Sequence, residues 1–296
     1  MITINQLHVF LAVAKREHVT QAAQDVNLSQ SAVSMALAEL EKQLNGPLFE
    51  RAGRNLKLNE RGRLLQQEAN KLMNHLDDML FLFSEENDSF SGELKVGASS
   101  TIGIYLLPEI IGRFVEKFPE VIINLEIGNT EQIEKNLLDY TLDLGFVEGS
   151  VHYENLASQS WLQDQLTIIA SPDYFPAKKR LLSIDELKEV KWIMREHGSG
   201  TREVFEKAIQ PYVSRIHNFL TFGHTEAVKQ AVKASLGLGC LSKYTVAQEL
   251  ERGTLIELKV PEISFERQLH LITRKNSYES RLRKKFNQFV FNIDGV

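Results

Sequence analysis

The first 60 residues place apolar side chains at the spacing of short helices. Residues 4–15 predict an opening helix, and two further helices follow on either side of a polar break at Asn27. Thr20 is expected to cap the first helix of this pair, and Ser29 or Ser31 the second, because a side-chain oxygen there accepts an unpaired N–H group of the first turn. The inward positions of the pair are Ala22, Ala23, Val26, Val33, Leu37, Leu40 and Leu44. The small alanines allow a close crossing, which is typical of a helix-turn-helix.

A helix-turn-helix reads DNA through the first turn of its second helix, which lies in the major groove. Gly46 and Pro47 are expected to end that helix, and residues 48–58 then predict a two-stranded wing. Cations on the wing suit the phosphate backbone or an adjacent minor groove. The expected DNA-binding residues are Thr20, Gln30, Ser31, Ser34, Arg51, Arg54 and Lys57. We therefore predict a winged helix-turn-helix DNA-binding domain over residues 1–58.

A long helix without proline is predicted from residue 59 onward. Its apolar positions alternate steps of four and three, which is the spacing of a seam for a partner helix: Leu65, Ala69, Leu72, Leu76, Met79 and Phe83. Such a stripe can also pack into the core of its own domain. Because this helix joins two domains and has no evident partner in its own, residues 59–91 are interpreted as a dimerisation linker.

Strands alternate with helices after Gly92. Strands are expected at residues 94–98, 121–127, 142–147, 166–170, 192–194, 219–222, 239–241 and 265–273. Helices are expected at residues 102–118, 130–140, 202–210, 226–236, 244–252 and 278–291. This order indicates a mainly parallel sheet whose last strand returns to the first group. The expected domain, residues 92–296, then has two lobes: lobe I at 92–162 and 266–296, and lobe II at 163–265.

Three strand-to-helix junctions in this domain are unusually polar, at residues 99–101, 197–202 and 224–226. Ligands of open α/β sheets bind at such junctions, where hydroxyls, backbone N–H groups and an arginine can hold an oxyanion. A two-lobed fold would bring these junctions to one crevice. The expected effector-binding residues are Ser99, Ser100, Thr101, Glu148, His197, Ser199, Thr201, Arg202, Thr225 and Glu226.

Each of these residues also has a purely structural interpretation. Serines and threonines that follow strands can be simple helix caps. Glu148 can be a solvated turn residue, or it can accept hydrogen bonds from the surroundings of a ligand. Arg202 can serve only as an ion-pair partner of Glu203 or Glu206 and not bind a ligand. Their convergence on one crevice is what favours a binding site.

Composition limits the classes of function. The net charge of −5 argues against a protein that coats nucleic acid non-specifically. Residues 1–60 carry as many acidic as basic side chains, so a single DNA-binding domain should bind weakly and several would have to act together. No stretch approaches the ~18 apolar residues of a membrane span, and no secretion signal opens the chain, so a cytoplasmic protein is expected. The single cysteine, Cys240, lies among apolar residues and is interpreted as a buried strand residue rather than a redox sensor.

The N-terminal 60 residues resemble the amino-terminal domain of the LysR-type transcriptional regulators. The resemblance rests on Leu7, Phe10, Ala12-Val13-Ala14, Thr20, Ala22-Ala23, the run from Leu28 to Ser34, Leu40-Glu41, Leu44, Gly46-Pro47-Leu48-Phe49, Arg51, Leu58 and Gly62. Many members carry basic residues further along the second helix, where this chain has Met35, Ala38 and Glu39. That departure leaves open which side chains read bases.

The resemblance implies an α+β protein: a winged helix-turn-helix, a long linker helix, and a two-lobed α/β effector domain like a periplasmic binding protein. The combination of ASSTIG, FVEG, REHGSGTRE and the helix start at Thr225-Glu226 is similar to a subgroup tied to inorganic anions and sulfur assimilation, some of whose members respond to sulfite. Sulfite or a related small anion is therefore the expected effector, and a small organic acid is the alternative. The expected partners are double-stranded DNA with a dyad site, further copies in a homodimer or homotetramer, and RNA polymerase.

An enzyme and a transported solute-binding protein are the distant alternatives. No Gly-x-Gly-x-x-Gly follows a strand, no lysine-containing phosphate loop is present, and no Gly-x-Ser-x-Gly surrounds Ser199. Histidine and cysteine do not occur at the spacing of a zinc site. A solute-binding protein would explain the lobes but not the helix-turn-helix. We therefore expect a non-enzymatic regulator without a cofactor or metal.

Overall fold

The computed structural model describes residues 1–52, 55–82, 90–175, 180–213 and 216–293. The chain divides into two compact units, Met1–Asp88 with Ser277–Arg281, and Ser89–Asn276 with Leu282–Val296. Each unit has hydrophobic cores of its own. Among the described residues, no helix is long and apolar enough to span a membrane.

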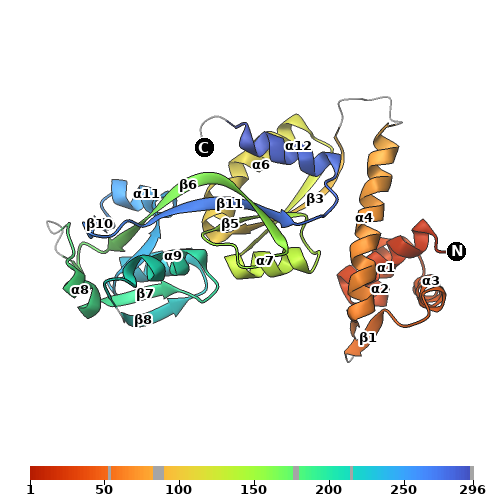
Figure 1. Cartoon of the computed structure of the whole chain (residues 1–296), viewed down its shortest axis with the longest axis horizontal. Helices are drawn as coiled ribbons and strands as arrows, with labels where there is room; N and C mark the ends of the chain where they lie inside the picture. Colours follow the sequence, from red (N-terminus) through yellow and green to blue (C-terminus); the bar gives the residue numbers. More distant parts are fainter. Residues whose placement is uncertain (53–54, 83–89, 176–179, 214–215, 294–296) are drawn as a thin grey trace. The chain divides into compact units, whose positions relative to one another are not determined.

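The N-terminal unit packs three helices against a small hairpin. These are α1 (Ile4–Arg16), α2 (Val19–Asp25), α3 (Gln30–Gln43), and the antiparallel strands β1 (Phe49–Ala52) and β2 (Asn55–Leu58), followed by α4 (Glu60–Leu82) (Figure 1). The core contains Val9, Phe10, Val13, Ala22, Ala23, Val33, Leu37, Leu40, Leu48 and Phe49. The inward positions predicted for α2 and α3 all contribute to this core or pack against it.

The turns that join these helices use left-handed backbone at polar residues. Asn27 has a φ of 53° at the predicted polar break, and Asn45 has a φ of 58° beyond α3. Helix α3 therefore ends at Gln43, earlier than expected from Gly46 and Pro47. Asparagine tolerates this conformation better than most residues, which explains why the chain can turn without glycine at either point.

One of the two predicted helix caps is correct and the other is wrong. Ser29 caps α3, and its hydroxyl accepts a hydrogen bond from the amide of Ala32. Thr20 does not cap α2, because that helix begins at Val19 and its N-cap is His18, which makes no side-chain cap hydrogen bond. Helix α1 ends at Arg16 and is followed by Glu17 at a φ of 51°, so α2 begins at once and Thr20 already lies in its first turn.

Helix α4 uses part of its apolar seam inside its own unit. Leu65 packs against the core of the three helices and Ala69 is buried, so the expectation that the seam lacks a partner within its own domain is wrong for its first turns. Further along, Leu72 and Met79 are 50% and 48% exposed. The predicted seam residue Phe83 lies outside the described residues.

Lobe I of the second unit is built on three parallel strands. In it, β3 (Gly92–Ser99) lies between β4 (Val121–Gly128) and β5 (Leu144–Glu148), as expected from the alternation of strands and helices. The helices of this lobe are α5 (Ser100–Tyr105), α6 (Leu107–Lys117), α7 (Thr130–Leu138) and α12 (Arg281–Phe291). The single helix expected at residues 102–118 is thus two helices, because Pro108 lacks an N–H and is suited to the first turn of a new helix.

Two long antiparallel strands, β6 (Leu156–Ala170) and β11 (Glu266–Arg274), run side by side from one lobe to the other (Figure 1). In lobe I, β11 also pairs with β5, and in lobe II β6 pairs with β9 (Gly239–Ser242) and β10 (Ile256–Leu258). The sequence predicted only the apolar end of β6, since residues 156–165 are mostly polar and exposed. The expectation of a mainly parallel sheet fails for this crossing pair.

Lobe II contains the parallel strands β7 (Lys191–Arg195) and β8 (His217–Phe222). Its helices are α8 (Ile184–Glu189), α9 (Gly200–Ile209), α10 (Thr225–Lys233) and α11 (Lys243–Glu251). Trp192 is fully buried at the centre of its core. Cys240 is buried in the same core, and burial raises the pKa of its thiol well above the usual range. The interpretation of Cys240 as a buried strand residue is confirmed.

Candidate functional site

The predicted reading face of the N-terminal unit is exposed. Gln30, Ser31 and Ser34 lie on the outer side of the first turns of α3, and Thr20 is exposed on α2. The hydroxyls of Ser29 and Ser31 lie 2.9 Å apart, so the capping residue also holds Ser31 in place. These side chains are free to meet a partner from solvent because their own unit packs only the opposite side of the helix pair.

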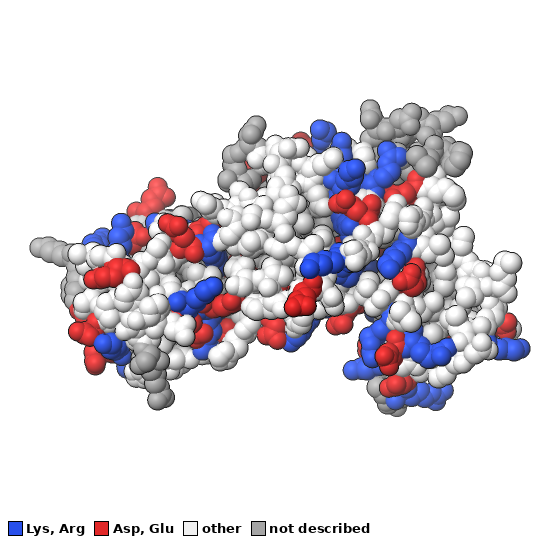
Figure 2. All heavy atoms as spheres, viewed as in Figure 1, with Lys and Arg blue, Asp and Glu red and all other residues white. Residues whose placement is uncertain are grey.

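The wing carries cations at the surface of the same unit. Arg51 and Lys57 are exposed on β1 and β2, whereas the predicted Arg54 lies outside the described residues. Figure 2 shows lysine and arginine side chains gathered near the wing, with acidic side chains among them. Arg16 is not counted among the cations that could contact DNA, because its guanidinium pairs with both oxygens of Asp25, at 2.6 and 2.9 Å.

A first buried polar cluster in the second unit surrounds Glu148, the last residue of β5. Its carboxylate accepts hydrogen bonds from the amide of Thr101 at 2.9 Å and the hydroxyl of Thr201 at 2.9 Å. The guanidinium of Arg267 donates to the same carboxylate at 2.7 Å. Burial alone would raise the pKa of Glu148, but Arg267 and these donors lower it to about 2. The alternative of a solvated turn residue is wrong for Glu148.

Arg267 connects four segments of the domain. Besides Glu148, its guanidinium donates to Asp164 at 2.7 Å, to Thr201 at 3.0 Å and to Thr101 at 3.2 Å. Asp164 in turn accepts a hydrogen bond from Ser242 at 2.8 Å. Thr101 and Thr201 are therefore brought together, as predicted, but a carboxylate of the protein itself already occupies the space between them.

The second buried cluster surrounds Arg195, the last residue of β7. Its guanidinium donates to the hydroxyl of Thr225 at 2.5 Å and to that of Ser100 at 3.4 Å, so it joins lobe II to lobe I. The neighbouring Glu196 accepts two hydrogen bonds from the same guanidinium, at 2.7 and 2.8 Å. Ser100 and Thr225, which were predicted from separate junctions, thus meet at one arginine.

Two of the predicted serines stand at N-cap positions but do not cap their helices with their side chains. Ser99 and Ser199 occupy the N-cap positions of α5 and α9, and neither makes a side-chain cap hydrogen bond. The Ser99 hydroxyl is buried and has no hydrogen-bond partner. An unpaired buried hydroxyl has an energetic cost, which a ligand or ordered water can remove.

The remaining predicted residues lie at the edges of these clusters. Arg202 pairs with Glu206 at 2.8 Å and donates to the Arg195 carbonyl at 3.0 Å, so its structural alternative is the one observed. Glu226 accepts hydrogen bonds from Tyr105 at 3.3 Å and from Gln230 at 2.7 Å. His197 is exposed.

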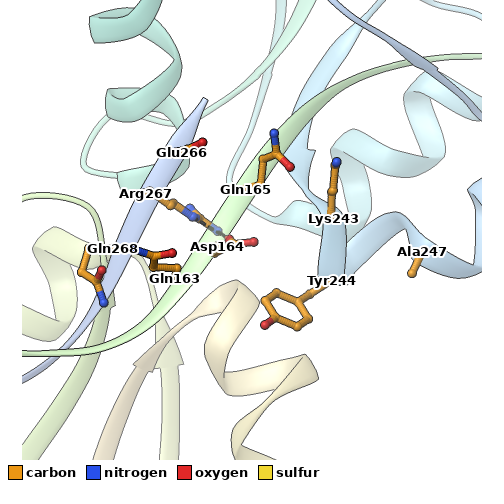
Figure 3. A pocket seen from close by; sticks show the side chains of 9 residues that line it. All are labelled: Gln163, Asp164, Gln165, Lys243, Tyr244, Ala247, Glu266, Arg267 and Gln268. Atoms are coloured by element: carbon orange, nitrogen blue, oxygen red, sulfur yellow. Dashed lines mark hydrogen bonds and ion pairs between the residues drawn. The ribbon is translucent and has the colours of Figure 1, made fainter. Parts of the chain in front are cut away.

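Open cavities lie beside the clusters rather than within them. A cavity of 660 Å³ lies along the crossing strands (Figure 3) and is lined by Gln163, Asp164, Gln165, Lys243, Tyr244, Ala247, Glu266, Arg267 and Gln268. A second cavity, of 390 Å³, includes the predicted His197, Ser199 and Arg202 in its lining. Within the described residues, no group of histidine, cysteine or carboxylate side chains could hold a metal ion.

Neither Arg195 nor Arg267 is among the residues predicted from the sequence. A signal for Arg267 was present, because it shares the period-two positions of β11 with Leu269 and Leu271, which face inward. An arginine among inward positions indicates a buried charge that needs partners. Arg195 stands directly before a polar turn and after the apolar run of β7, which gives a weaker signal of the same kind.

Comparisons with known proteins agree with this architecture. Residues 4–63 match the "Bacterial regulatory helix-turn-helix protein, lysR family", and residues 87–292 match the "LysR substrate binding domain". Over 285 residues the chain is 38% identical to the "Uncharacterized HTH-type transcriptional regulator YeiE" of Escherichia coli strain K12, which covers 96% of both proteins.

Solved structures show the same fold. The Synechocystis PCC6803 CcmR regulatory domain in complex with 2-PG is 28% identical, with a TM-score of 0.63 over 68% of this chain and 96% of that one. Full-length CbnR, solved with its target DNA, is 17% identical, with a TM-score of 0.64 over 97% of this chain and 98% of that one. The chain therefore belongs to the LysR family and is a non-enzymatic, DNA-binding transcriptional regulator with an effector-binding domain.

Proposed function

We propose that a small anion controls this regulator by binding where lobe I and lobe II meet at Arg195. The observation that carries the proposal is the contact of one buried guanidinium with Ser100 of lobe I and Thr225 of lobe II. A ligand that accepts hydrogen bonds from both hydroxyls would stabilise one relation of the lobes over another. The unpaired hydroxyl of Ser99 adds a donor on the same turn of chain.

The internal carboxylate of Glu148 changes the expected roles of the other residues. Since Glu148 already accepts from Thr101, Thr201 and Arg267, this cluster acts as a preformed frame beside the ligand. The ligand-contacting donors are then Ser99, Ser100, Ser199 and Thr225. Glu148, Thr101 and Thr201 hold the two lobes at the distance that those donors require.

Sulfite is the effector that we propose first, on the resemblance of the three junctions to regulators tied to sulfur assimilation. Its oxygens accept hydrogen bonds without needing a hydrophobic pocket. A small organic acid is the second candidate, because the CcmR regulatory domain, at 28% identity, was solved with 2-PG.

We further propose that Gln30, Ser31 and Ser34 contact base edges while Arg51, Arg54 and Lys57 contact phosphates. The exposed seam residues Leu72 and Met79 favour pairing of α4 with a second copy of the chain. Two or four linked copies would supply the combined affinity that a single neutral domain lacks, and a dyad site would match their symmetry.

Thermal unfolding of the full-length protein against sulfite, sulfate, thiosulfate, nitrate and several organic acids tests the effector. A ligand of the native state raises the melting temperature, and the dependence of that rise on ligand concentration gives its affinity. Thr225→Val removes a proposed ligand contact and should weaken binding at least about tenfold. Thr254→Val, an exposed threonine of lobe II, is the matched control and should bind like the wild type. Equal affinity in Thr225→Val would contradict the proposed site.

DNA binding is tested separately with a promoter fragment bearing a dyad. Gln30→Ala should reduce discrimination between specific and random DNA by about 1–3 kcal/mol. Arg51→Ala should weaken both kinds of binding alike and reduce their salt dependence. A reversal of these two patterns would contradict the assignment of base and phosphate contacts.

A further inference from the structure

The arginines near the proposed effector site are all paired with carboxylates of the protein itself. Arg195 pairs with Glu196 and Arg202 pairs with Glu206, each at 2.7 to 2.8 Å. Arg267 pairs with two carboxylates, those of Glu148 at 2.7 Å and Asp164 at 2.6 Å. At Arg195 and Arg267, two guanidinium charges thus face three carboxylates, an excess of one negative charge, whereas Glu206 is 45% exposed beside Arg202.

We propose that Glu196 is the specificity-determining residue of the effector site. It cancels the charge of Arg195, and the site therefore accepts ligands with no more than one negative charge. This inference rests on the proposed function for the position of the ligand, and it adds the charge class that the ligand must have.

The geometry of Glu196 supports a role of this kind. Both of its oxygens accept from the guanidinium of Arg195, in the two-point arrangement that is strongest for this pair of groups. Asn129 of lobe I donates at 3.1 Å to Oε1 of the same carboxylate, which also accepts from Arg195, and so adds a third hydrogen bond from the other lobe. Its side chain is only 24% exposed. A carboxylate that is held at three points does not swing into solvent when a ligand arrives.

The surroundings of Glu196 favour its charged form. Burial by itself would raise the pKa of this carboxyl group, but the hydrogen bonds and charge of Arg195, together with Asn129, lower it below the usual range.

Because the guanidinium of Arg195 is paired with Glu196, a ligand at this position would be bound mainly by neutral hydrogen-bond donors. The hydroxyls of Ser99 and Thr225 can donate hydrogen bonds to an oxyanion without adding positive charge. The hydroxyl of Ser100 donates to the Gly128 carbonyl at 3.4 Å and can turn from it to a ligand. A singly charged ligand then gains hydrogen bonds at a modest electrostatic cost. A doubly charged ligand is repelled by the excess carboxylate, and water screens this repulsion little because Glu148 and Asp164 are buried and Glu196 is only 24% exposed. Such a site distinguishes nitrate or hydrogensulfite, the singly charged form of the proposed effector sulfite, from sulfate or thiosulfate.

The substitution Glu196→Gln tests the inference, because glutamine keeps the shape and removes the charge. We expect its affinity for sulfate, measured by calorimetry on the full-length protein, to rise by about tenfold or more over the wild type. Its affinity for nitrate should rise much less. The matched control is Glu206→Gln, which changes the net charge of the domain equally but affects Arg202, and sulfate affinity should then stay within about twofold of the wild type.

A second variant moves the charge in the opposite direction. Asn129→Asp keeps a residue that caps α7, since both side chains are good N-caps. It places a further carboxylate beside Glu196, so binding of every anion should weaken. This variant remains informative if Glu196→Gln folds poorly, which thermal unfolding without ligand will show.

The outcomes separate this inference from the proposed effector. If the wild type binds no small anion but Glu196→Gln binds sulfate, the proposed effector is wrong and the role of Glu196 stands. If the wild type binds sulfate as tightly as nitrate, or if Glu196→Gln and Glu206→Gln bind sulfate alike, the role of Glu196 is overturned. Tighter anion binding by Asn129→Asp would overturn it as well.

Discussion

The two polar regions of this chain are built in opposite ways. The proposed DNA-binding residues Gln30, Ser31 and Ser34 are exposed, lie within one turn and a half of a single helix, and make few contacts. Most of the candidate residues of the effector domain are buried, and Arg267 reaches Thr101, 166 positions away in the sequence. An exposed binding surface can be built from neighbouring residues whose polar groups are solvated by water. In a buried site, each charged group needs a partner from the protein even when no ligand is bound.

Removing the guanidinium of Arg267 is the strongest test of this difference. Arg267→Met leaves Glu148 and Asp164 buried without a counterion, and the effector domain should lose about 3–5 kcal/mol of stability. Both tryptophans, Trp161 and Trp192, lie in this domain, so their fluorescence during urea unfolding reports it selectively. Adding Glu148→Gln and Asp164→Asn should restore part of the loss. Wild-type stability of Arg267→Met alone would mean that the ion pairs of this cluster do not stabilise the domain.

Alanine substitutions at two glycines, one in each unit, test whether the two units unfold independently. A Cβ on Gly62 would lie 2.1 Å from the Leu48 carbonyl oxygen, and a Cβ on Gly200 would lie 2.0 Å from that of Glu148. We expect each alanine variant to destabilise its own unit by about 2–3 kcal/mol. Gly62→Ala should lose DNA binding and keep the tryptophan transition, and Gly200→Ala should shift that transition to lower urea. Gly112→Ala, where nothing lies within 4 Å of the added Cβ, is the control.

The cap of α3 should have a smaller and strictly local effect. Ser29→Ala removes the acceptor for the Ala32 amide and should destabilise the first turn of α3 by about 1 kcal/mol. Hydrogen exchange in the first turns of α3 should then accelerate, while amides of the effector domain exchange as before. Ser31→Ala is the control, because Ser31 contacts Ser29 but accepts no backbone amide. Equal acceleration in both variants would contradict the assigned cap.

The smallest effect that we expect depends on pH and involves His152. Its two ring nitrogens lie 3.0 Å from Glu134 and 3.0 Å from Glu203, so both can donate only when the ring is protonated. Burial lowers the pKa of His152, but the hydrogen bond and charge of Glu134, followed by those of Glu203, raise it above the ordinary value.

The raised pKa of His152 determines the sign of this effect. The contribution of the ring to stability is complete below the pKa of the unfolded chain, and it is lost as pH rises through the folded pKa. The decrease in unfolding free energy caused by His152→Gln should therefore be larger at pH 6 than at pH 9. Burial lowers the pKa of His270, so His270→Gln should show the opposite trend and serves as the control. A cost of His152→Gln that does not change with pH would mean that the ring is not protonated in the folded protein.

The sequence predicts the N-terminal unit better than the effector domain, for a physical reason. Helix caps, turns and apolar faces depend on neighbours within a few positions, so Ser29, the wing and the inward faces of α2 and α3 are all found. The wrong cap at Thr20 arises because α1 ends at a left-handed Glu17, and nothing in the pattern of apolar residues shows that turn.

The effector site is only partly predictable because its contacts are long-range. The polar junctions locate Ser100, Thr101, Thr201 and Thr225 on the chain, but they do not show which arginine reaches them. Arg202 looked like the ligand contact and pairs with Glu206, one helical turn away. Arg267 is brought to Thr101 only by the antiparallel crossing of β6 and β11, whose polar half has no strong pattern of its own.

The buried thiol of Cys240 makes the stability of lobe II directly measurable. Because burial raises its pKa, a thiol-reactive reagent can modify this cysteine only in molecules whose lobe core has opened. The chain contains no other cysteine, so the rate of modification of the native protein reports how often that opening occurs. An effector that binds lobe II together with lobe I, as proposed, should slow this labelling as its occupancy rises, without any substitution in the protein.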